Sequence, residues 1–314
     1  MNGIHCRDAA NTSHSGLWGS QLSILQIAPL PERHSRRLNP LLRYLSLLLL
    51  LIATSAPAQQ RIVSLNLCTD LLLLELVPHS RIASLTYWAA DSDLSYLADS
   101  VGDIPLNHSL AEEIVPLQPD LVLAGQFSDL QLVALLQQMG IRVEVVDVPL
   151  TLEGMREHFL SVGKLVGASQ RAAEMADLID ARLAAVAADN TADKPLAAVY
   201  GPQGVSPGSD TLLNDLLSLS GFRNLAAEEG IVSYGTLSLE SLVMAQPDVL
   251  LIDNLSSNRD SVAHQALRHP ALRRQFSRSQ VLEMPSWLTA CVGPPVAEAA
   301  ERLLAHRLQL QGQP

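Results

Sequence analysis

The chain has 314 residues, of which 48% are apolar, and it carries a formal net charge of −11. That length fits one large domain or two ordinary ones, and the apolar share is ample for a buried core. Because an acidic surface repels polyanions, the charge excludes nucleic acid and anionic lipid as expected partners.

Residues 1–58 are expected to be an N-terminal extension and a secretory signal peptide. Four arginines (Arg33, Arg36, Arg37 and Arg43) precede an apolar run at 45–53, and small residues follow, ending at Ala58. This order is typical of a cleaved signal, and the run is shorter than the roughly 20 residues of a membrane span. We therefore expect cleavage near Ala58 and export. The remaining chain has 16 basic and 30 acidic residues, a net charge of −14.

Strands and helices alternate through residues 61–150. Apolar runs predict strands at 61–67, 81–86, 121–124 and 142–146, and intervening segments predict helices at 71–76, 109–117 and 129–139. Such alternation indicates a parallel sheet with helices on its faces. The strands are almost continuously apolar, as a sheet covered on both sides requires.

Residues 151–190 are predicted to connect this lobe to a second one. A helix is expected at 151–166, and another from Ser169 to Ala188, whose apolar residues follow the helical period. At 1.5 Å per residue the second helix would be about 30 Å long, enough to reach between two lobes.

The alternation restarts in residues 195–310. Strands are predicted at 196–200, 249–252 and 281–284, and helices at 211–219, 239–245 and 295–310. The expected fold class is therefore α/β, with two Rossmann-like lobes that have parallel-type sheets and are bridged by a single long α-helix.

One segment occurs in both lobes. Residues 110–125 (LAEEIVPLQPDLVLAG) align with residues 238–253 (SLESLVMAQPDVLLID) at a constant offset, which pairs Glu112 with Glu240, Pro119 with Pro247 and Asp120 with Asp248. A shared offset at several positions indicates that the two lobes are structurally equivalent.

Several stretches together are characteristic of one family: the opening RIVSLNLCTD, the two Glu-bearing helices that end in Pro-Asp, the long connecting helix, GSDTLLNDLLSLSGFRNLAAEEG and SWLTACVGPPVAEAAERL. Over residues 61–310 the chain resembles the periplasmic substrate-binding proteins of ABC importers for cobalamin, iron–siderophores and heme. The resemblance implies a periplasmic protein, monomeric when free, that holds a small-molecule metal chelate between its lobes. It also implies an ABC permease dimer with a cytoplasmic ATPase as partner. We expect no cofactor, although the ligand itself can carry cobalt or iron.

The resemblance further implies that Glu112 and Glu240 dock the protein onto the permease. Two carboxylates on opposite lobes suit two basic pockets of a two-fold partner. The alternative is that each is an ordinary exposed acid near a helix N-terminus, where negative charge is favourable.

Candidate ligand-binding residues follow the predicted strands, because ligands of open parallel sheets gather at the carboxyl ends of the strands. Aromatic side chains are concentrated there, as a cleft for a large, flat, partly apolar chelate would require. The resemblance favours Trp287, because cobalamin-binding relatives carry an aromatic residue in the matching loop; any single aromatic residue can equally be a packing residue. The candidates are Cys68, Thr69, Tyr87, Trp88, Gln126, Phe127, Tyr200, Gln203, Tyr234, Asn254, Trp287 and Cys291.

Cys68 and Cys291 allow three interpretations. In the first they form a disulfide between the lobes, and in the second they are two thiols that contact the metal of the ligand. In the third they are unrelated and inert. The oxidising compartment favours the disulfide.

The ligand class is narrowed by what the loops lack. The histidines are scattered, without the spacing of a metal site, so a bare metal ion is not expected. The cleft loops offer too few basic residues for an anionic siderophore, since Arg223 and Arg259 are the only nearby candidates. This shortage favours a corrinoid or heme-like ligand. No dinucleotide-binding, phosphate-binding or nucleophile-elbow motif is present, so we expect no catalytic residue. A ligand sensor for a signalling receptor remains the alternative to transport, and an enzyme on a Rossmann-like scaffold is the third class.

Overall fold

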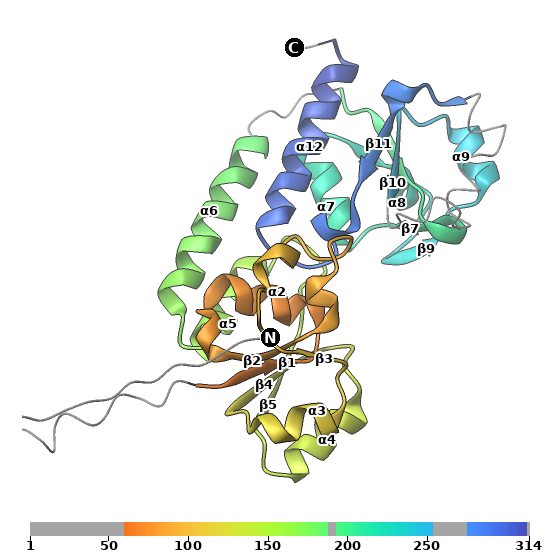
Figure 1. Ribbon diagram of the computed structural model, residues 1–314. Helices are drawn as coiled ribbons and strands as arrows, with labels where there is room; N and C mark the ends of the chain where they lie inside the picture. The colour runs from red at the N-terminus through yellow and green to blue at the C-terminus, as the bar shows by residue number, and fades with distance from the viewer. Residues whose placement is uncertain (1–59, 188–192, 254–274, 313–314) are drawn as a thin grey trace, which may run out of the picture. The chain divides into compact units, whose positions relative to one another are not determined.

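The computed structural model describes residues 60–187, 193–253 and 275–312, and two parallel sheets organise them (Figure 1). The first sheet has the strand order β3-β2-β1-β4-β5, and every neighbouring pair is parallel. Its strands are β1 (Ile62–Ser64), β2 (Ile82–Thr86), β3 (Leu106–Asn107), β4 (Leu121–Gly125) and β5 (Val143–Val146).

Helices cover both faces of this sheet (Figure 1). On one face, Ile62, Leu121 and Leu123 pack in a core with helix α2 (Leu67–Leu76). On the other, Val63 and Val122 pack against α4 (Leu130–Gln138) and the short α3 (Ala111–Ile114). Successive strand residues point to opposite faces, so a doubly covered strand must be apolar throughout.

The second sheet repeats this plan. Its strand order is β11-β10-β6-β8, again parallel throughout. An antiparallel ribbon of β7 (Val205–Pro207) and β9 (Tyr234–Thr236) accompanies it. The sheet strands are β6 (Leu196–Val199), β8 (Arg223–Asn224), β10 (Val249–Asp253) and β11 (Val281–Met284), and the helices are α7 (Leu212–Leu219), α8 (Leu225–Glu228), α9 (Leu239–Ala245) and α12 (Pro294–Leu310).

Helix α6 (Ser169–Ala187) links the two lobes, following α5 (Met155–Leu165). Arg171 near its start binds the backbone oxygen and the carboxylate of Glu75 on α2. Arg182 near its end makes a bidentate pair with Glu301 on α12, at 2.7 and 2.8 Å. The buried apolar residues of α6 belong to one core that continues from the first sheet to the second. The predicted bridging helix and the two α/β lobes are therefore present.

The sequence repeat has a structural explanation. In each lobe the carboxylate of the Pro-Asp aspartate accepts the backbone N–H at the start of the first strand: Arg61 N to Asp120 Oδ2 and Leu196 N to Asp248 Oδ2, both 2.7 Å. The backbone closes the pair with Asp120 N to Arg61 O and Asp248 N to Leu196 O. The repeat thus marks equivalent helix-to-strand turns.

Some helix starts differ from the prediction. Ser109 has a φ of 58°, which is outside the helical range, so α3 begins at Ala111 rather than at 109. Gly154 has a φ of 81°, and α5 begins one residue later instead of at 151. Among the described residues, no helix is both long and apolar enough to cross a membrane.

Candidate functional site

A cavity of about 430 Å³ lies at the carboxyl ends of the first three strands. Each strand contributes the residues that follow it, because parallel strands bring their carboxyl ends to one edge. The lining residues are Leu65, Asn66, Leu67, Thr86, Tyr87, Trp88, Leu94, His108 and Ser109.

Three rings form one wall of this cavity. The centroids of Tyr87 and Trp88 are 4.2 Å apart, and His108 stacks on Tyr87 at 4.9 Å. Glu113, on α3, accepts hydrogen bonds from the backbone N–H of His108 at 2.6 Å and from its ring Nδ1 at 3.0 Å. These hydrogen bonds lower the pKa of the Glu113 carboxyl, so it stays ionised.

A second cavity of about 400 Å³ is lined mainly by the other lobe, and Leu94 belongs to the walls of both. Tyr234, at the start of β9, is its aromatic residue, with 62% of its surface exposed. The two cavities adjoin at Leu94, and we take them together as the candidate composite site. The remaining lining residues are Gly201, Val205, Pro207, Leu212, Leu213, Met284, Ser286, Thr289 and Ala290.

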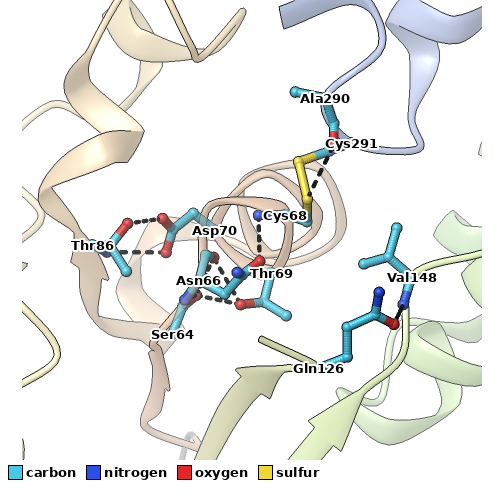
Figure 2. Close-up of a disulfide and its surroundings, with 10 residues drawn as sticks. All are labelled: Ser64, Asn66, Cys68, Thr69, Asp70, Thr86, Gln126, Val148, Ala290 and Cys291. Atoms are coloured by element: carbon cyan, nitrogen blue, oxygen red, sulfur yellow. Dashed lines mark hydrogen bonds between the residues drawn. A yellow bond between two sulfur atoms is a disulfide. The ribbon is translucent and has the colours of Figure 1, made fainter. Parts of the chain in front are cut away.

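Cys68 and Cys291 form a disulfide beside these two cavities, with their Cα atoms 5.2 Å apart (Figure 2). Cys68 lies in the first turn of α2, next to the lining residue Leu67, and Cys291 follows the lining residue Ala290. Cys68 Sγ is 3.7 Å from the Ala290 carbonyl oxygen; this is a contact, because a disulfide sulfur carries no hydrogen. The bond therefore covalently ties the first lobe to the second at the candidate site.

The start of α2 is fixed by a dense polar network (Figure 2). Asn66 caps the helix by accepting the N–H of Cys68 at 2.9 Å. Thr69 is fully buried and its hydroxyl shares a hydrogen bond with Ser64 Oγ at 2.6 Å. Asp70 accepts the N–H of Thr86 at 3.0 Å and also its hydroxyl group. Thr69 therefore positions the helix and offers no free group to a ligand.

The pKa of Asp70 is unusual. Burial raises it from 3.8 to about 6, against the opposing effect of hydrogen bonds from Ser64 and Thr86.

The other candidate residues are placed differently. Tyr200 is 8% exposed and belongs to the core of the second lobe. Trp287 packs against the main core, with the Arg302 guanidinium 5.7 Å from its ring centroid, and it does not line either cavity. Gln126 accepts the N–H of Val148 at 3.2 Å and so joins two loops of the first lobe. Phe127 is 83% exposed. A binding role for these four residues stays a prediction.

Arg223, the basic candidate within the described residues, lines neither cavity. Arg223 pairs with Glu228 at 3.0 Å and donates to the Lys194 carbonyl. Arg259 and Asn254 lie outside the described residues, and Gln203 is exposed with a φ of 57°. Within the described part of the chain, no group of three or more His, Cys, Asp or Glu residues could hold a bare metal ion.

The most informative residues absent from the sequence-based candidates are His108 and Ser109. They follow β3, which has only two residues and therefore no recognisable periodicity. Only their position in the chain could have indicated them, because the segment between the second predicted strand and the repeat had no assigned role.

A separate cavity of about 630 Å³ lies between β5 and α5 and contains none of the candidate residues. Its wall includes Glu144, Asp147 and Glu157, and His158 Nε2 has no hydrogen-bond partner among the described residues. Burial lowers the pKa of His158. Because this cavity belongs to one lobe and is rimmed by acids, we place the candidate ligand site at the composite cavities instead.

Glu112 and Glu240 occupy matching places in the two lobes. Each is in the first turn of its helix, α3 or α9, and each is exposed. Neither carboxylate makes an ion pair with another described residue.

Comparison with known proteins gives a consistent assignment. The family model for periplasmic binding proteins matches residues 62–276. Two curated cobalamin-binding proteins, from two strains of Halobacterium salinarum, are each 26% identical to the chain over 217 residues. The alignment covers 68% of this chain, and the chain spans 58% of the length of those relatives.

Solved structures share the fold. The apo periplasmic heme-binding protein of Roseiflexus sp. RS-1 has a TM-score of 0.65 at 21% identity, covering 81% of this chain and 99% of that one. The periplasmic vitamin B12-binding protein of Vibrio cholerae has a TM-score of 0.60 at 17% identity, covering 81% and 98%. The family match, over more than two thirds of the sequence, decides the assignment: the chain belongs to the periplasmic binding protein family.

Proposed function

We propose that the protein is the solute-binding component of an ABC importer and that it captures a metal chelate at the composite site, with a corrinoid favoured over heme and a ferric siderophore. The proposal rests on the chemical composition of the residues that line the two cavities, which meet at Leu94. They combine aromatic and aliphatic walls with a few hydroxyl and amide groups, which suits a large, flat ligand with polar edges.

The charge of the walls favours a corrinoid. No Lys, Arg, Asp or Glu lines either of the two cavities over the described residues. Heme carries two carboxylates and ferric siderophores are commonly anionic, so their burial requires cationic partners. A corrinoid has amide groups at its edge, and hydroxyl, amide and backbone groups are sufficient for these. The names of the Halobacterium relatives support the same ligand class.

A calorimetric panel tests the ligand. Cobalamin, cobinamide, heme and a ferric siderophore are titrated into the exported protein, and we expect one-to-one binding that is tightest for a corrinoid. Tyr87→Ala and Tyr234→Ala, one from each cavity, should weaken binding about three- to tenfold, the amount that an aromatic contact contributes. Leu130→Ala, at an exposed apolar position that lines neither cavity, is the matched control. An absence of binding throughout the panel would contradict the proposal.

The docking role of Glu112 and Glu240 is part of this proposal. Their equivalent, exposed positions suit two basic pockets related by a permease two-fold axis. We expect the double variant Glu112→Ala, Glu240→Ala to leave ligand affinity unchanged and to abolish binding to the permease complex in nanodiscs. Glu153→Ala alters an exposed acid that lies outside the repeat and outside both cavities, and it serves as the control. An equal loss of ligand affinity in the double variant would show that these acids belong to the ligand site.

A further inference from the structure

His108 differs from the other lining residues because it is the single side chain among them that can coordinate a metal through an imidazole nitrogen. It follows β3 at the carboxyl edge of the first sheet, and 61% of its side chain is exposed. The ring stacks on Tyr87, which holds its plane within 26° of the phenol plane. A ligand that enters the cavity can therefore reach a ring with a defined orientation.

Glu113 determines which nitrogen of His108 is available. An ionised carboxylate can only accept hydrogen bonds, so the 3.0 Å contact between Glu113 Oε1 and His108 Nδ1 requires a proton on Nδ1. In the neutral ring this leaves the lone pair on Nε2. The second carboxylate oxygen accepts the His108 backbone N–H at 2.6 Å, which anchors the carboxylate to the same residue. Metal-bound histidines typically have this arrangement, with a carboxylate that orients the ring and raises its basicity.

The described surroundings of Nε2 do not suit a bare ion as its partner. No described cluster offers the three or more His, Cys, Asp or Glu ligands that a free cation would need, and the lining residues next to His108 are apolar, aromatic or neutral. A single imidazole is sufficient when a macrocycle already supplies the equatorial ligands and one axial position is open.

We propose that His108 Nε2 is an axial ligand to the metal of the captured chelate, oriented by Glu113 and stacked on Tyr87. This inference rests on the proposed function and narrows it: the preferred cargo is a macrocyclic chelate whose axial water can be displaced, and a siderophore that already saturates its iron is disfavoured. The bond that forms is metal to Nε2, and the axial water leaves unchanged, so no oxidant, reductant or proton is consumed.

Cobinamide provides the test, because its axial positions can be open or blocked without changing the macrocycle. Diaquocobinamide has an exchangeable water on each face, and dicyanocobinamide has a tightly held cyanide on each. We expect the protein to bind the diaquo form at least about tenfold more tightly, with a change in the visible spectrum of the corrin that indicates nitrogen ligation. His108→Ala should remove both the preference and the spectral change, so that it binds the two forms with equal affinity. Hemin and its bis-cyanide complex form a parallel pair of probes.

Two controls separate ligation from a structural role. His79→Ala removes an exposed histidine that lines neither cavity, and it should behave as the wild type. Glu113→Gln keeps the ring of His108 but weakens its orientation, so it should reduce the preference for the diaquo form without abolishing it. In the ligand-free protein, nitrogen NMR of the imidazole should show the Nδ1–H tautomer, and Glu113→Gln should shift the ring towards a mixture of tautomers.

The outcomes distinguish this inference from the proposed function. Equal binding of both cobinamide forms, with the same spectrum in the wild type and in His108→Ala, would overturn axial ligation and leave corrinoid capture standing. Tight binding of a ferric siderophore, with no binding of cobinamide or hemin, would also overturn axial ligation but keep chelate capture. Failure to bind any of these probes would overturn both.

Discussion

Asp70 shows how a single carboxyl at the edge of the site couples stability to pH. It is fully buried, and its oxygens accept hydrogen bonds from the backbone and the hydroxyl of Thr86. These contacts tie the first turn of α2, which carries Cys68, to the end of β2, where the aromatic wall begins. Burial nevertheless outweighs the hydrogen bonds and raises the pKa to about 6.

The raised pKa predicts a loss of stability as pH increases. Because the folded-state pKa of about 6 exceeds the ordinary 3.8, the folded protein binds the proton more tightly than the unfolded chain. The contribution of Asp70 is therefore fully present below pH 3.8 and is lost as pH rises through 6, by about 3 kcal/mol or less. Asp70→Asn keeps an oxygen for the Thr86 N–H but cannot titrate. Urea unfolding between pH 4 and 7 should show the variant gaining stability relative to the wild type; a difference that does not vary with pH would contradict this prediction.

The placement of the candidate residues shows that the sequence predicts the edge of the sheet at which a residue lies but not the direction of its side chain. The position after a strand placed Tyr87 and Trp88 among the candidates, and both line the first cavity, because parallel strands bring their carboxyl ends to one edge. The same reasoning included Thr69 and Tyr200, whose side chains turn into the core. Position along the chain determines which edge a residue reaches, whereas the direction of its side chain depends on packing against neighbours that are distant in sequence.

At the scale of elements, length decides what could be predicted. Helix α9 and strand β11 have the predicted bounds because each is an apolar run with clear breaks at both ends. The strands β3, β7, β8 and β9 have two or three residues each, and their pairing comes from tertiary contacts that no local pattern encodes. His108 directly follows one of these short strands, β3, and was therefore absent from the predicted candidates.

The repeated turn predicts matched effects in the two lobes. Asp120→Ala and Asp248→Ala each remove the acceptor of a backbone N–H at 2.7 Å and should each lower the free energy of unfolding by about 1–2 kcal/mol. Asp120→Asn and Asp248→Asn retain a side-chain oxygen and are the controls. Because the two turns share no partner, the effects should add in the double alanine variant. Chemical denaturation measures them, and a strongly non-additive result would show that the lobes are coupled through these turns.

At the scale of the whole molecule, helix α6, the main core and a disulfide join the lobes over the described residues. Helix α6 is paired with α2 through Arg171 and with α12 through Arg182. The main core runs through this helix from the first sheet to the second. The disulfide adds a covalent connection between residues separated by 223 positions. The first two connections can hold the lobes without the third, so the disulfide has a separable effect.

The location of the disulfide beside both cavities predicts that it slows ligand release as well as stabilising the fold. Closing so long a loop typically contributes about 2–5 kcal/mol to the free energy of unfolding, and the double variant Cys68→Ser, Cys291→Ser should lose that amount while remaining folded through α6. A disulfide that acted only on the unfolded chain would leave ligand dissociation unchanged. A bond that also restricts separation of the lobes at the cleft must slow dissociation, so the variant should release ligand faster in stopped-flow competition. Reduction of the wild type should reproduce the variant, and Cys68→Ala with Cys291→Ala controls for the added hydroxyl groups. If the ligand dissociation rate is unchanged while the free energy of unfolding falls, the disulfide only stabilises the fold. The motion that admits the ligand then occurs elsewhere in the cleft.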